Sequence, residues 1–112
     1  MLRRSLTVVL EKNATFDADF ATEPYEAAWA GEARWFVRVF ELAGEGAQLS
    51  LAPQISPDGL EWCPEGSPRL TIGEAGLYSL SLERFGHWLR LQGRFEGPQP
   101  RARLQIYLAL KE

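Results

Sequence analysis

The sequence has very few of the residues on which most catalytic and metal sites depend. One cysteine, Cys63, and one histidine, His87, occur in 112 residues. A single cysteine excludes an internal disulfide, and these two side chains alone cannot form a cysteine/histidine zinc site. Basic residues do not predominate either, since the net charge is −3. That charge argues against nucleic acid as the main partner, because phosphate binding requires a basic surface.

Long apolar runs are also missing. No stretch approaches the roughly 20 apolar residues that cross a bilayer, so we expect no membrane partner. Near the N-terminus a short apolar patch, residues 6–10, is followed at once by Glu11 and Lys12, and no small-residue cleavage site appears. We therefore predict a strand at this position, no signal peptide and a cytoplasmic location.

Alternation of apolar and polar residues with a period of two dominates the chain, and turn residues interrupt it about every ten positions. Residues 33–42 are apolar on both faces, which predicts a strand that is central in its sheet or has one face covered by a neighbour. A short helix over residues 23–33 stays open as an alternative to strand. The pattern predicts strands over residues 4–10, 33–42, 49–55, 70–72, 78–82, 87–95 and 101–111, and two further short segments over residues 16–20 and 25–29.

Strands and turns at this spacing are typical of all-β proteins. We predict a single domain over residues 1–112, an antiparallel β-sandwich of jelly-roll type with seven or eight strands. Strand order cannot be derived from the pattern alone.

The most motif-like stretch is SPDGLEWCPEG, residues 56–66. Pro57 presets φ, the Asp58 side chain can bond the backbone, and Gly59 accepts a positive φ, so Ser56 to Gly59 predict a β-turn. Trp62 begins the returning strand. We interpret Ser56, Asp58, Gly59 and Trp62 as a structural turn, with a carbohydrate platform on Trp62 as the functional alternative.

Three segments also carry a resemblance. The SPDGLEW turn, the FGHWLRL segment at residues 85–91 and the IYLALK segment at residues 106–111 fit S-x-D-G-x-x-W, F-G-x-W/Y-L/V-R-L/V and I-Y-L-x-L-K. Over residues 50–112 the chain resembles a loose group of small β-sandwich proteins from phage and bacterial genomes. The resemblance implies a virion-type or self-assembling accessory protein. For such a protein, a location in the virion is the alternative to the cytoplasm.

Charge is distributed unevenly along the chain. Residues 11–45 hold eight acidic and three basic residues, whereas residues 84–103 hold five arginines and one glutamate. The acidic half of one copy could therefore bind the basic part of another. The alternative is that these arginines pair with acids of their own chain.

In the last two predicted strands, the outward positions carry aromatic residues and arginines. Aromatic residues and arginine are enriched in interface cores. We therefore predict a non-enzymatic structural protein that associates with itself, as a trimer or a larger capsid-like or shell lattice. Stacking of single-stranded nucleic acid on two of the aromatics is a further alternative. The predicted self-association residues, expected on one exposed sheet face, are Trp88, Arg90, Arg94, Arg103 and Tyr107.

Other functions remain as alternatives. A carbohydrate- or ligand-binding module would use Trp29, Trp62 or Trp88 as a stacking platform. A small enzyme would need clustered acids or a Cys63–His87 pair, although the acidic neighbours of Cys63 oppose a thiolate. A calcium site could use Asp17, Asp19 and Glu23. We predict no catalytic, metal or cofactor site.

Overall fold

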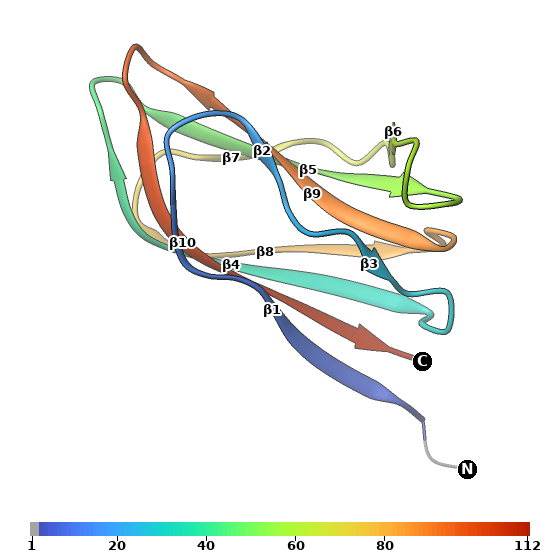
Figure 1. Ribbon diagram of the computed structural model, residues 1–112. Helices are drawn as coiled ribbons and strands as arrows, with labels where there is room; N and C mark the ends of the chain where they lie inside the picture. Colours follow the sequence, from blue (N-terminus) through green and yellow to red (C-terminus); the bar gives the residue numbers. More distant parts are fainter. Residues whose placement is uncertain (1–2) are drawn as a thin grey trace.

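The computed structural model describes residues 3–112, and all of their regular structure is strand (Figure 1). Residues 3–112 hold no helix that could cross a membrane. The helical alternative for residues 23–33 is wrong, because the segment forms a two-residue strand and a turn closed by Ala30 N donating to Ala27 O at 3.0 Å. The strands are β1 (Ser5–Phe16), β2 (Phe20–Ala21), β3 (Tyr25–Glu26), β4 (Glu32–Ala43), β5 (Gln48–Ser56), β6 (Cys63–Pro64), β7 (Leu70–Ile72), β8 (Gly76–Glu83), β9 (Trp88–Glu96) and β10 (Arg101–Lys111).

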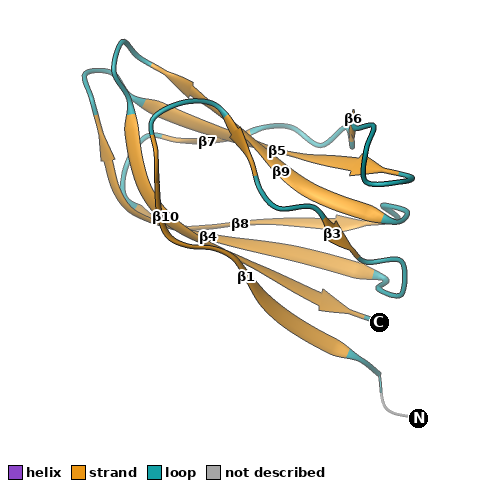
Figure 2. Ribbon diagram, viewed as in Figure 1, coloured by secondary structure: helices purple, strands orange, loops and turns teal. Residues whose placement is uncertain are grey.

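The strands form two antiparallel sheets that face each other (Figure 2). Sheet A has the order β1-β10-β4-β8, and sheet B has β2-β9-β5-β6, with β3 also on β9 and β7 also on β5. Because β2 and β3 share one neighbour, as β6 and β7 do, each pair is one interrupted strand. The ten strands then reduce to eight, with orders 1-8-3-6 and 2-7-4-5. The jelly-roll sandwich predicted from the sequence is confirmed.

The core lies between the sheets and follows the alternation of each strand. In β10, Leu104, Ile106, Leu108 and Leu110 are all fully buried. Trp35 of β4 is the largest fully buried side chain and lies opposite Leu108 in the sheet. Of the two alternatives for residues 33–42, the central position is the correct one, since β10 and β8 flank β4.

The first strand is longer than predicted. It was expected to end at residue 10, but β1 runs to Phe16 through register shifts between Val9 and Glu11 and between Glu11 and Ala14. Asn13 takes a positive φ of 49° in this segment. Bulges insert extra residues into a strand without ending its pairing, and they interrupt the alternation on which the prediction depended.

Candidate functional site

The predicted interface residues lie on the two opposite outer faces of the sandwich. Trp88, Arg90 and Arg94 belong to β9 in sheet B, whereas Arg103 and Tyr107 belong to β10 in sheet A. The expectation that they share one face is therefore wrong. Their outward parity was inferred within each strand, but the sheet to which a strand belongs depends on long-range pairing. Trp88 and Tyr107 cannot form one stacking path for a nucleic acid either.

The outer face of sheet B is covered in part by the chain's own connection between β5 and β7. The Arg90 guanidinium lies 4.4 Å from the ring centroid of Trp62, and its Nε donates to Gln54 Oε1 at 2.6 Å. A Cβ atom at Gly59 would lie 3.1 Å from the Trp88 ring, so the turn packs directly on that ring. Trp88 and Arg90 consequently have partners within their own chain.

Arg69 anchors the far end of the same connection. Its Nε donates to Ser50 Oγ and its Nη1 to Gln92 Oε1, both at 2.9 Å. Burial lowers the pKa of the Arg69 guanidinium, and the nearby charge of Arg94 lowers it further. An arginine remains charged in proteins despite such shifts. These contacts hold the connection against β5 and β9.

The connection begins with a tight turn made by Ser56, Asp58 and Gly59. Ser56 Oγ accepts hydrogen bonds from the backbone N–H of Asp58 and Gly59 at 3.2 and 2.8 Å. Asp58 Oδ1 accepts from the N–H of Leu60 and Glu61 at 2.9 and 3.1 Å. Gly59 has φ of 79°, which other residues rarely adopt. The geometry is that of a structural turn, and Trp62 places its ring on β9 from there.

We expect Asp58→Ala to lower the melting temperature at pH 7. Hydrogen bonds from the N–H of Leu60, then of Glu61, hold the pKa of Asp58 below its usual range. A lowered carboxylate pKa stabilises the fold above the usual aspartate pKa of about 3.9, and that contribution disappears as the pH falls through the lowered value. The melting temperatures of wild type and Asp58→Ala should therefore differ most at pH 7 and approach each other as the pH falls through the lowered pKa of Asp58. Glu61→Ala is the control on the same turn, and an equal effect of both changes would contradict the assignment.

The outer face of sheet A is open. Its apolar side chains include Val9, Phe40 and Leu77, which are 49%, 38% and 56% exposed. Phe36 and Tyr107 lie beside each other in the register at the centre of the face. We call this surface the A face. Its outward side chains are Val9 on β1, Glu32, Arg34, Phe36, Arg38, Phe40 and Glu41 on β4, Leu77 on β8, and Arg103, Gln105, Tyr107, Ala109 and Lys111 on β10.

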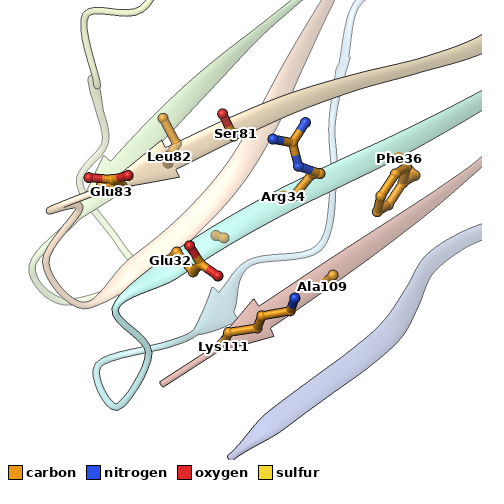
Figure 3. A pocket seen from close by; sticks show the side chains of 9 residues that line it. Glu32, Arg34, Phe36, Ser81, Leu82, Glu83, Ala109 and Lys111 are labelled. Atoms are coloured by element: carbon orange, nitrogen blue, oxygen red, sulfur yellow. The ribbon is translucent and has the colours of Figure 1, made fainter.

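Three arginines stand among the aromatics of the A face. Arg103 lies 4.8 Å from the ring centroid of Phe40, and its Nη1 donates to Asn13 Oδ1 at 2.8 Å. Arg34 Nη1 donates to Ser79 Oγ at 3.0 Å. Arg34 and Phe36 also line a hollow of about 340 Å³ between β4, β8 and β10 (Figure 3). The outward residues of β4 were missing from the predicted interface, although their parity alone could have identified them.

Pairing within the chain explains few of the arginine charges. In residues 3–112, the ion pairs are Arg4–Glu112, His87–Glu26 and Arg101–Glu41. Among the arginines of residues 84–103 that the structure describes, Arg101 alone reaches an acid, at 3.0 Å. Intrachain pairing therefore does not explain Arg94 or Arg103.

Cys63 and His87 line the same small hollow but do not form a nucleophile–base pair. His87 Nε2 lies 3.0 Å from Glu26 Oε1, and Cys63 Sγ approaches the carbonyl oxygen of Ile55 at 3.7 Å. Between these two described side chains there is no hydrogen bond, which acid–base activation of a thiol requires. The hollow has a volume of about 250 Å³ and is lined by Ile55, Ser56, Pro57, Cys63, Phe85, Gly86 and His87.

Each tryptophan already has a partner in the chain. The Arg4 guanidinium lies 4.2 Å from the ring centroid of Trp29, and Arg90 covers one face of Trp62. Trp88 packs against the turn at Gly59, and Trp35 is fully buried. No flat platform of neighbouring tryptophan rings for stacking a sugar is therefore evident among residues 3–112.

The acids considered for calcium have a different arrangement. Asp19 Oδ1 accepts a hydrogen bond from Phe95 N at 2.9 Å and so ties the chain before β2 to the end of β9. Within the part of the chain that the structure describes, no three Asp, Glu, His or Cys side chains gather as metal ligands. Asp17, Asp19 and Glu23 do not converge.

Several solved structures contain this fold. The PBSX exported protein XepA has a TM-score of 0.69 at 11% identity, over 94% of this chain and 36% of its own. A chain of infectious bursal disease virus Gt strain has a TM-score of 0.67 at 13% identity, over 97% of this chain and 32% of its own. A chain of the T13 IBDV viral particle has a TM-score of 0.61 at 13% identity, with 97% and 31% covered.

This chain thus spans about a third of the length of each of those proteins. At such low identity the likeness establishes the fold, which is shared with a viral group of β-sandwich chains. No family model and no curated protein sequence matches the chain.

Proposed function

We propose that this protein is a non-enzymatic structural protein that associates with copies of itself, as a component of a virion-type or shell-like assembly. The observation that carries the proposal is the A face. Val9, Phe40 and Leu77 stay exposed there, and arginines stand between the aromatic side chains. Exposed apolar surface of this kind is typical of partner sites.

The composition of the A face supports a protein partner. Phe, Tyr and Arg are enriched at interfaces, whereas Lys and Glu are depleted. The middle of the face follows that pattern, because Phe36 and Tyr107 form its central row and Arg34 and Arg38 flank this row. The opposite outer face, on sheet B, already packs against the connection that carries Trp62 and Arg69.

Two further observations favour a second copy of this chain as the partner. The uneven charge of the sequence supplies both signs on one molecule, so identical copies can attract one another. The fold is shared with chains of virus particles, which supports a structural role. The predicted residues Arg103 and Tyr107 belong to this proposed interface, and Arg94 offers a second contact on sheet B.

Self-association predicts a mass above that of one chain. At tens of micromolar protein and about 0.05 M salt, light scattering should give a multiple of 12.6 kDa. Salt at about 1 M shortens the Debye length to about 3 Å, so the mass should fall if charges guide the contact. A mass of 12.6 kDa at every protein and salt concentration would refute the proposal.

A further inference from the structure

The geometry of the A face points to one specific arrangement of two copies. We infer that the A face packs on the A face of a second copy, about a two-fold axis that runs parallel to the strands between β4 and β10. This inference rests on the proposed self-association and adds its surface, its partner and its symmetry. A two-fold contact of this kind fits a dimer, a dihedral assembly or a shell, and a lone three-fold ring does not contain it.

The register of β10 and β4 divides the A face into rows that cross the sheet. Figure 3 shows part of these rows, with Glu32, Arg34 and Phe36 along β4 and Ala109 and Lys111 along β10. From one end of the face to the other, the rows pair Lys111 with Glu32, Ala109 with Arg34, Tyr107 with Phe36, Gln105 with Arg38, and Arg103 with Glu41.

A two-fold axis parallel to the strands places each row of one copy opposite the same row of the other copy. It exchanges the positions of β10 and β4. In each row, β10 of one copy then faces β4 of the other. Lys111 faces Glu32 of the second copy at one end, and Arg103 faces Glu41 of the second copy at the other end. Each contact occurs twice by symmetry. Opposite charges therefore meet at both ends of the face.

Between those ends, an aromatic ring meets an aromatic ring and a polar group meets a polar group. Tyr107 faces Phe36 of the second copy in the central row, and Arg38 faces Gln105 of the second copy in the next row. The exposed Val9 on β1 lies against β8 of the second copy, and the exposed Leu77 on β8 lies against β1 of the second copy. Sheets that pack face to face lie about 10 Å apart at roughly −30°, so side chains from both copies can interdigitate.

The other symmetric way to stack the two faces brings like charges together. A two-fold axis across the strands, through the central row, keeps each strand and reverses the order of the rows. Lys111 then faces Arg103 of the second copy, and Arg34 faces Arg38 of the second copy. Glu32 faces Glu41 of the second copy. Repulsion in these rows excludes this arrangement in favour of the first.

The size of the face suits such a contact. Four strands about 4.8 Å apart are about 20 Å wide, and the stretch of β4 between Glu32 and Glu41 is about 30 Å long. A standard interface buries about 800 Å² on each partner, which is close to what side chains on a surface of these dimensions expose.

Charge reversal in the terminal row tests the arrangement. Lys111→Glu places a glutamate against Glu32 of the second copy, and Glu32→Lys places a lysine against Lys111 of the second copy. Sedimentation velocity at about 0.05 M salt should show the Kd of each variant alone raised about tenfold or more. An equimolar mixture of the two variants should associate within a few-fold of wild type, because opposite charges then meet again between the copies.

The mixture also separates contacts between copies from contacts within one chain. Lys111 and Glu32 are neighbours within each chain, and the like charges created there remain in the mixture. Recovery on mixing can therefore come only from contacts between different chains. Both side chains are exposed, and circular dichroism melts would verify that each variant folds.

Each remaining outcome overturns the inference in its own way. If both single variants associate more tightly than wild type, the axis runs across the strands. If Arg94→Glu on sheet B abolishes association while both A-face variants behave as wild type, another surface is the interface and the proposed self-association survives. If wild type is monomeric throughout, the proposed function fails together with the inference.

Discussion

Trp35→Ala is expected to lower the free energy of unfolding by about 3–5 kcal/mol. Trp35 is fully buried in β4, where it pairs with Leu108 of β10 and Leu80 of β8. Removing its ring leaves a cavity at the centre of sheet A, and the rigid ladder on both sides prevents collapse around it. Because whole domains are stable by only about 5–15 kcal/mol, urea denaturation should show a greatly reduced midpoint.

Trp35→Phe is the matched control for this change. No hydrogen-bond acceptor among residues 3–112 pairs with Trp35 Nε1, and an unpaired buried donor costs about 1–3 kcal/mol. Phenylalanine removes that donor while filling most of the space, so it should cost less than half as much as alanine. Equal losses for the two variants would contradict the cavity explanation.

Gly93→Ala is expected to destabilise the protein by about 2–3 kcal/mol, although alanine adds only one methyl group. A Cβ atom at Gly93 would lie 2.5 Å from Cε1 and 2.6 Å from Cζ of Phe20. Phe20 cannot easily move aside, because its ring stacks on Phe16 with centroids 4.0 Å apart and lies against Phe95 at 6.2 Å. The methyl group must therefore displace a packed aromatic cluster at the edge of sheet B.

Gly73→Ala is the control for Gly93→Ala, because no other atom lies within 4 Å of the position of its Cβ. It should be neutral or slightly stabilising, since alanine restricts the unfolded chain. Urea midpoints of the two variants measure the difference. A Gly93→Ala protein as stable as Gly73→Ala would show that the aromatic cluster is loosely packed.

The predicted interface shows most clearly which features cannot be predicted from the sequence. Alternation in β9 and β10 correctly separated buried from outward residues, because it depends only on the pleat of one strand. Whether Arg94 and Arg103 share a face depends on which strands lie beside β9 and β10. Those neighbours, β5 and β4, are far away in the chain, and no local pattern encodes them.

The same reasoning applies to pairs that meet across long stretches of chain. The turn residues Ser56, Asp58 and Gly59 were identifiable because their hydrogen bonds are local. The contact of Trp62 with Arg90 was not, and neither was the cover that it provides for sheet B.

From the sequence by itself came the all-β class, the antiparallel sandwich of seven or eight strands and the outward parity of Arg103 and Tyr107 in β10, because backbone alternation and turn chemistry act within a few residues. Only the tertiary structure decided which outer face is covered and which is open. That decision depends on hydrogen bonds such as those from Arg69 to Ser50 and Gln92, which join residues about 20 positions apart in sequence. Such contacts form only after the sheets have assembled, and they leave Phe36, Arg38 and Tyr107 together on the A face.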